Sequence, residues 1–86
     1  MATAALIPVV VRDRKGVVWE GQARAVSAIN ARGAFDVLPV HANFITILKK
    51  KLVLHKTDGS KEEMNLDNGV MWVLTNKIEV YVGVSK

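Results

Sequence analysis

The chain has 86 residues, a formal net charge of +4 at pH 7 and no cysteine. This length supports one small hydrophobic core and excludes a second domain or a deep, fully enclosed substrate pocket. The lack of cysteine excludes a disulfide framework and a thiolate zinc site. Half of the residues are apolar, which is typical of a globular chain rather than a disordered one, so we expect a single domain over residues 1–86.

Valine is abundant, with 14 copies, and its branched Cβ favours strands over helices. Turn-forming residues recur about every 8–12 positions, the spacing of a sandwich or barrel. Gly21 indicates either a bulge or a close approach of two backbones. Turns are predicted at 12–16 and 30–33. The predicted strands of the first half are residues 6–11, 17–20 and 34–38.

The second half shows the same alternation of strand and turn signals. Asp58-Gly59 predicts a hairpin with a type I′ turn, which needs positive φ at both central residues. Further turns are predicted at 67–69 and 75–77. The stretch Val70–Leu74 is apolar throughout, which indicates a strand covered on both sides or one that faces a partner. The predicted strands are residues 52–56, 61–66, 70–74 and 78–84.

One segment fits two structures. Phe44, Ile47 and Leu48 fit a helical spacing, whereas Ile45 and Thr46 extend a run of β-branched residues. We predict a strand over 43–49, and with it an all-β fold.

No residue pattern points to catalysis. The serines and the two histidines, His41 and His55, lie in strand or turn contexts rather than in a nucleophile elbow. Two histidines without a shared carboxylate motif make a weak metal site, and the glycines form no phosphate-binding loop. We therefore assign no catalytic, metal or cofactor residues and predict that His41 is structural.

The basic balance leaves one alternative open, a small basic β-module that binds nucleic acid. The only basic run is Lys49–Lys51, and the aromatic residues are scattered rather than interleaved with cations as base stacking would require. A solvated basic surface is therefore favoured, with no nucleic acid as partner. Phe35, Phe44 and Trp72 remain candidates either for the core or for anchors of an apolar protein interface.

The most specific segment is Gly33-Ala34-Phe35-Asp36-Val37-Leu38-Pro39-Val40-His41-Ala42-Asn43-Phe44-Ile45-Thr46-Ile47-Leu48. It resembles the signature of the ε subunit of F-type ATP synthase (δ in mitochondria), in which a glycine, a short apolar strand and Leu-Pro precede a histidine and an apolar run with threonine. Residues 17–21, 67–73 and 76–80 match the same family in order and spacing, so the resemblance covers residues 5–84.

The resemblance implies the family's N-terminal domain, a flattened β-sandwich of about eight to ten short strands. That domain belongs to the rotor: it binds the γ subunit and the c ring, and couples ion translocation to ATP synthesis without bond chemistry or a cofactor. The implied location is peripheral, on the cytoplasmic face of the energy-transducing membrane, without direct insertion. Self-association of the isolated domain stays open.

The resemblance also implies candidate partner-binding residues. Asp13, His41 and Thr46 occupy places that face γ, and the Gly33-Ala34-Phe35 turn occupies the place that meets the c ring. The full set is Asp13, Ala34, Phe35, His41, Ala42 and Thr46. Val40 replaces the usual glycine after Pro39, and Ala34 replaces a frequent acidic residue, which weakens the polar contact inferred to the ring.

The family's C-terminal helical hairpin has no counterpart in the pattern, because strand signals continue to Val84. An independent helix needs about 12–15 residues to be even marginally stable in water. We therefore expect a chain that couples rotation but neither inhibits it nor binds ATP.

Overall fold

The computed structural model describes residues 6–39 and 43–83. These residues form six strands and no helix, which confirms the all-β prediction, and they contain no helix that could cross a membrane. The strand predicted over 43–49 is also confirmed, as the start of a longer one. The strands are β1 (Ile7–Asp13), β2 (Gly16–Asn30), β3 (Gly33–Val37), β4 (Phe44–Lys56), β5 (Lys61–Leu74) and β6 (Lys77–Val82).

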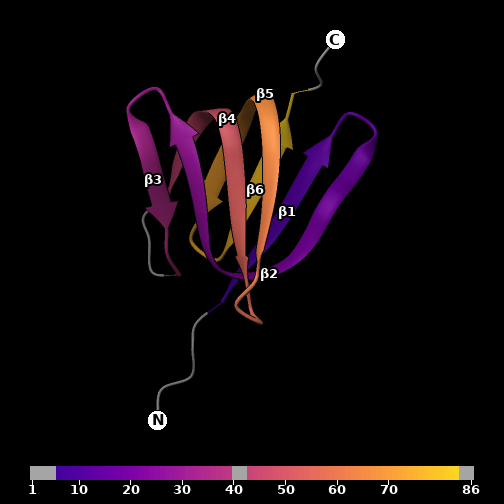
Figure 1. Ribbon diagram of the computed structural model, residues 1–86, viewed down its shortest axis with the longest axis vertical. Coiled ribbons are helices and arrows are strands. Elements are labelled where there is room, and N and C mark those ends of the chain that lie inside the picture. The colour runs from indigo at the N-terminus through magenta and orange to yellow at the C-terminus, as the bar shows by residue number, and fades with distance from the viewer. Residues whose placement is uncertain (1–5, 40–42, 84–86) are drawn as a thin grey trace.

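The sheet closes on itself. Its order is β1-β6-β5-β4-β2-β3, and β1 also pairs with β2, so five strands form a barrel and β3 extends it as an extra strand. All pairings are antiparallel except that of β1 with β6. β1 and β3 lie on opposite sides of the molecule in Figure 1, joined through the long β2.

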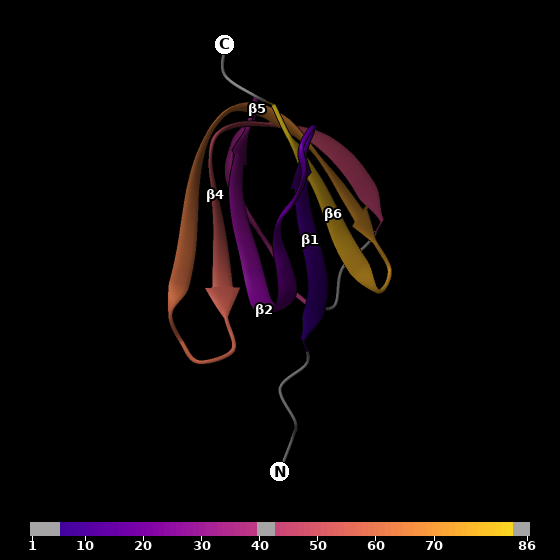
Figure 2. The same ribbon diagram turned by 90° about the vertical axis from the view of Figure 1, so that its right-hand side faces the viewer.

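The three long strands each serve both layers of this flattened barrel. β2 pairs with β1 through its first half and with β3 and β4 through its second half. β4 and β5 curve over one end of the molecule, as Figure 2 shows. If β2, β4 and β5 are counted once in each layer, the six strands supply nine strand segments, in agreement with the eight to ten expected.

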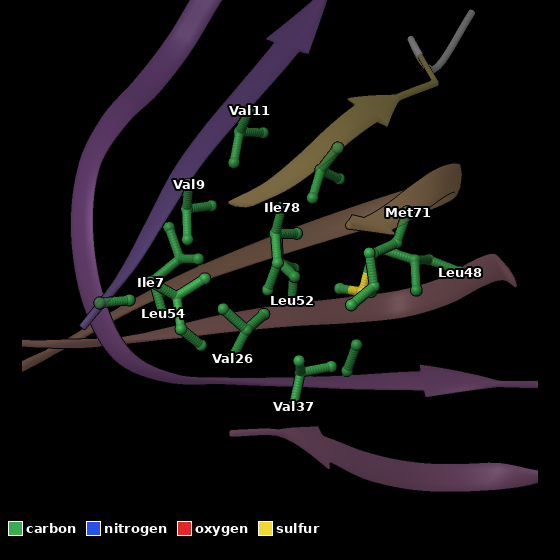
Figure 3. Packing of buried hydrophobic residues seen from close by; sticks show 14 residues of the cluster. Ile7, Val9, Val11, Val26, Val37, Leu48, Leu52, Leu54, Met71 and Ile78 are labelled. Atoms are coloured by element: carbon green, nitrogen blue, oxygen red, sulfur yellow. The ribbon is translucent and has the colours of Figure 1, made fainter. Parts of the chain in front are cut away.

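The core lies between the two layers and is entirely apolar among the described residues. Figure 3 shows side chains from β1, β2, β4 and β6 converging there. Their alternation along each strand follows from the two-residue period of a β-strand, which sends every second side chain inward. The buried residues are Ile7, Val9, Val11, Ala23, Val26, Ala28, Val37, Leu48, Leu52, Leu54, Met71, Val73, Ile78 and Val80.

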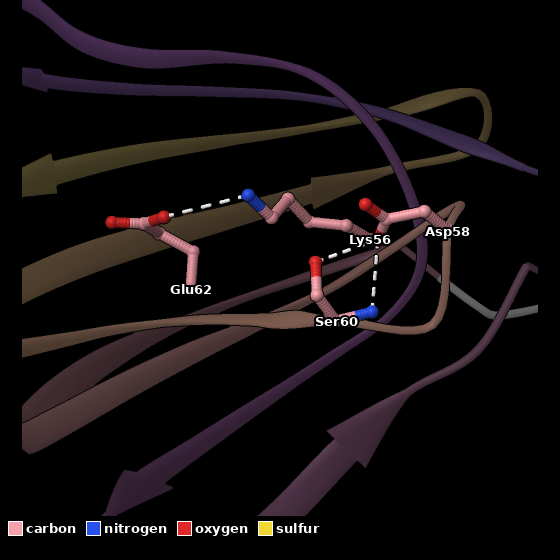
Figure 4. A network of polar contacts seen from close by, with 4 residues as sticks. All are labelled: Lys56, Asp58, Ser60 and Glu62. Carbon is pink, nitrogen blue, oxygen red and sulfur yellow. Dashed lines mark hydrogen bonds and ion pairs between the residues drawn. The ribbon is translucent and has the colours of Figure 1, made fainter.

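The β4–β5 hairpin differs from its prediction. Gly59 N–H donates to the Lys56 carbonyl, Lys56 N–H donates to the Ser60 carbonyl, and within this turn only Gly59 has positive φ, at 90°. This is a three-residue loop with a glycine bulge rather than a type I′ turn. Ser60 also donates from its amide and its hydroxyl to Asp58 Oδ1, which lowers the pKa of Asp58, and Lys56 pairs with Glu62 (Figure 4).

Two predictions that rested on glycines, the turn at 67–69 and the role of Gly21, have different outcomes. The turn predicted at 67–69 is wrong, because β5 runs through it without a break and pairs Gly69 with both Leu48 and Val82. Gly21 keeps a regular register with Val9 and marks a close approach instead: a Cβ there would lie 3.1 Å from the Trp19 ring. Gly69 borders a shift in the register of β5 with β4, and a Cβ there would lie 2.9 Å from the Tyr81 carbonyl oxygen, so neither glycine marks a chain reversal and both allow a close approach.

Candidate partner-binding surface

The first half of β4 carries apolar side chains on both of its faces. Leu48 points inward and is fully buried, whereas Ile45 and Ile47 point outward and are 56% and 63% exposed. An alternating strand at a protein surface normally turns polar residues outward. This segment therefore leaves an unusual amount of apolar surface in contact with water.

The neighbouring strand extends this surface. Trp72 lies directly across from Ile45, and Val70 directly across from Ile47. Trp72 is 46% exposed, so the apolar run at 70–74 is not covered on both sides within this chain. We call the surface formed by Ile45, Ile47, Val70 and Trp72 the apolar face. A contiguous exposed apolar area of this kind is typical of an interaction site.

A groove of about 630 Å³ adjoins the apolar face. One wall is the turn between β2 and β3, residues 30–32, and the other is the first half of β4. The side-chain amide of Asn30 donates to the Thr46 hydroxyl at 3.1 Å and holds the two walls together. The residues that line the groove are Asn30, Ala31, Arg32, Ile45, Thr46, Ile47 and Val70.

The charges around this surface are mostly positive. Arg32 lines the groove and Lys49 follows Ile47 on β4; neither forms an ion pair within the described part of the chain. On the β6 side of this surface, Tyr81 lies directly across from Val70. The Arg12 guanidinium lies 5.9 Å from the centre of the Tyr81 ring. An apolar surface with unpaired cations at its border favours a partner that carries carboxylates.

An acidic group beside the apolar face is already paired. Glu79 lies across from Trp72, and its carboxylate is 2.9 Å from the Lys77 ammonium. The hydrogen bond from Lys77, with the positive charges of Lys77 and Arg12, holds the pKa of Glu79 below its ordinary value. Glu79 therefore stays negative at neutral pH and does not cancel the charge of Arg32 or Lys49.

The sequence-predicted site residues fall into separate places. Thr46 lies in the groove, half-buried. Ala34 and Phe35 lie on β3, where the Phe35 ring packs edge-on against Phe44 with 6.3 Å between centroids. Phe35 is thereby partly core, whereas Phe44 is 40% exposed. His41 and Ala42, and with them the predicted structural role of His41, lie outside the described residues.

Asp13 has a local structural task. Its Oδ1 accepts hydrogen bonds from the backbone amides of Lys15 at 2.8 Å and Gly16 at 3.2 Å, which closes the β1–β2 hairpin. It lines a different hollow, between that hairpin and β5, from the one that contains Thr46. The structure therefore does not bring Asp13 together with Thr46.

One polar cluster has the residue types of a hydrolase triad but not their arrangement. The Ser27 hydroxyl donates to Asp36 Oδ1 at 2.7 Å and lies 2.8 Å from His55 Nε2. Because the hydroxyl proton points to Asp36, His55 must donate to Ser27 and cannot act as its base. Within the described ranges, no three His, Asp or Glu side chains gather as a metal site.

Most of the groove is not predicted from the sequence. The patterns place Ile45, Ile47 and Val70 only in strands, and Asn30 and Arg32 only in a turn. One feature of the sequence does indicate the exposed face. Ile45 and Ile47 alternate with Leu48 and share a face with Lys49, so they point away from the core into which Leu48 points.

Comparison with known proteins supports one family. The family model for the ATP synthase delta/epsilon chain, β-sandwich domain, matches residues 7–84. Among curated proteins, the ATP synthase epsilon chain of Brevibacillus brevis is 37% identical over 65 residues, which is 74% of this chain and 49% of that protein. That of Campylobacter lari is 33% identical over 66 residues, which is 76% of this chain and 51% of that protein. The chain thus spans about half the length of these relatives.

Solved structures share the fold. A chain in the cryo-EM structure of the Euglena gracilis mitochondrial ATP synthase (OSCP/F1/c-ring) superposes with a TM-score of 0.84 at 16% identity, covering 95% of this chain and 53% of that one. A chain in the Tetrahymena thermophila mitochondrial ATP synthase central stalk and c-ring structure gives 0.74 at 11% identity, covering 96% and 67%. From the family match and the shared sandwich, this chain belongs to the ATP synthase delta/epsilon family, within its β-sandwich domain.

Proposed function

We propose that this protein is a central-stalk rotor subunit of an F-type ATP synthase, which binds the γ subunit and the c ring and does no catalysis of its own. The observation that carries the proposal is the apolar face with its adjoining groove, which contains Thr46, a residue that the family resemblance assigns to γ. Family membership supports the assembly, and the surface supports a protein partner rather than a small substrate.

The apolar face suits a long-lived protein interface. It combines two isoleucines, a valine and a tryptophan on two adjacent strands, and half-exposed aromatic and aliphatic side chains of this kind are typical anchors of stable complexes. We assign it to γ. We assign the Ala34–Phe35 end of β3 to the c ring, with the subunit peripheral on the cytoplasmic side of the membrane.

The test is co-purification with γ. The chain is co-expressed with the γ subunit of the same organism, and Ile47→Asp is compared with Leu6→Asp, since Leu6 is also an exposed apolar residue but lies before β1, away from the groove. Ile47→Asp is expected to weaken retention of γ by about tenfold or more, because it buries a charge in an apolar interface. Equal retention by both variants contradicts the assignment of this surface to γ.

A salt titration separates this function from the nucleic-acid alternative. Binding to phosphates weakens steeply as salt rises, through release of counterions, whereas an apolar protein interface responds little. We expect γ binding to change little between about 50 and 200 mM salt, whereas a steep loss of binding to DNA or RNA without γ binding would favour the alternative.

A further inference from the structure

The first half of β4 has a free backbone edge. Residues 44–48 pair with residues 69–73 of β5 on one side, but β2 pairs with β4 only from Leu52 onward. In the described part of the chain no strand pairs with the other edge of 44–48. Because alternate residues of an antiparallel strand direct their N–H and C=O groups to opposite sides, every second residue here presents backbone groups that no described strand pairs.

An irregularity in the pairing of β4 with β5 adjoins this edge. Between the pairs Leu48–Gly69 and Lys50–Leu66, one residue of β4 faces two of β5, and Lys50 of β4 has positive φ, at 68°. A bulge of this kind bends the sheet locally and increases its twist. β4 therefore leaves β2 at this point and crosses to the other layer, where its edge faces the turn at residues 30–32 across the groove.

The groove offers three kinds of contact to one occupant. The edge of β4 supplies backbone donors and acceptors in a strand register. Ile45, Ile47 and Val70 supply apolar contacts, and Arg32 supplies a cation that forms no ion pair within the described ranges. A helix satisfies its own backbone groups and leaves those of β4 unused, whereas an extended segment can satisfy them.

We propose that an extended segment of the partner adds as a strand to the free edge of β4 at residues 44–48, places alternate apolar side chains against Ile45, Ile47 and Val70, and presents a carboxylate to Arg32. This inference rests on the proposed function and names the segment by which γ engages the groove. A second copy of this chain fits less well, because a two-fold pairing along this edge would place two Arg32 side chains in the same groove.

The direct test is amide hydrogen exchange, measured by NMR on the labelled chain alone and in complex with γ. In the free chain, one alternating set of amides within 44–48 is expected to be protected by β5, and the other set to exchange rapidly. On binding, the unprotected set is expected to slow by about tenfold or more, because its N–H groups become hydrogen-bonded. A complex in which that set still exchanges rapidly overturns strand addition but leaves the proposed function intact.

A charge reversal tests the carboxylate. Arg32→Glu is compared with Arg24→Glu, since Arg24 is an exposed arginine of β2 outside the groove. Arg32→Glu is expected to weaken γ binding by about tenfold or more. Arg24→Glu is expected to stay within about twofold. Equal effects of the two substitutions overturn the carboxylate contact. If the wild-type chain does not bind γ at all, the proposed function is overturned instead.

Self-pairing has its own signature. If protection of the free-edge amides rises with the concentration of the chain alone, a second copy occupies the edge and the proposal is wrong. If these amides become protected only when γ is present, the added strand comes from γ, as proposed.

Discussion

The side-chain amide of Asn30 donates a hydrogen bond to the Thr46 hydroxyl across 3.1 Å, and so joins the turn after β2 to the first half of β4. The same Asn30 accepts the Arg32 backbone amide on its Oδ1 at 2.9 Å. One side chain therefore shapes the turn and fixes the distance between the two walls of the groove. Residues 16 positions apart in sequence are in this way brought to one binding surface.

This contact can be tested by removing its acceptor. Thr46→Val keeps the shape of the side chain but leaves the Asn30 amide without its partner at a half-buried site. We expect the free energy of unfolding to fall by about 1–2 kcal/mol. Thr46→Ser, which retains the hydroxyl, is the matched control in urea denaturation. Equal losses in both variants would show that the hydrogen bond contributes nothing to stability.

The two faces of β4 should respond differently to truncation. Leu48 is fully buried and Ile47 is 63% exposed, although they are adjacent in sequence. Leu48→Ala is expected to destabilise the fold by about 2–5 kcal/mol, through lost apolar burial and a residual cavity. Ile47→Ala is expected to change stability by about 0.5 kcal/mol or less. Chemical denaturation monitored by tryptophan fluorescence measures both, and similar losses would contradict the assignment of the two faces.

The β4–β5 hairpin depends on a glycine. Gly59 has φ of 90°, a conformation that costs an L-residue with a Cβ about 1–2 kcal/mol. Gly59→Ala is therefore expected to destabilise the protein by about 1 kcal/mol, although nothing lies within 4 Å of the added methyl group. Thr57→Ala, in the same loop, controls for a change of side chain without a change of backbone preference. A neutral Gly59→Ala would mean that the loop adopts another turn in solution.

The ion pair between Lys77 and Glu79 predicts a pH dependence. Because the folded-state pKa of Glu79 is lowered, mainly by the hydrogen bond from Lys77, its contribution is present at neutral pH. It is lost as pH falls below the ordinary value of 4.5 and through the folded-state pKa. We expect Glu79→Gln to destabilise the protein at neutral pH and to approach the wild type in acid.

Thermal unfolding at about pH 7 and about pH 3 measures this convergence. Lys77→Met, which removes the partner instead, should likewise reduce the loss of stability on acidification. A constant difference between Glu79→Gln and the wild type across this range would show that Glu79 is not stabilised in its charged form.

The sequence alone predicted those features of this protein that depend on near neighbours. The branched residues at 45–47 favoured a strand over a helix, and the strands predicted at 6–11, 52–56 and 78–84 overlap β1, β4 and β6. The order of motifs around Leu38-Pro39 also indicated the family to which the chain belongs. Local backbone preference and side-chain alternation are enough for such predictions.

Only the tertiary structure decided which strands continue and which surfaces remain open. The signal at 67–69 is typical of a turn, yet β5 passes through it, because Leu66 on one side pairs with β4 and Gly69 on the other pairs with both β4 and β6. The apolar run at 70–74 does not reveal that Trp72 faces water, and nothing local pairs Asn30 with Thr46. The binding groove depends on the bend of β4 away from β2, which is a property of strand pairing across the whole sheet and has no counterpart in any short segment.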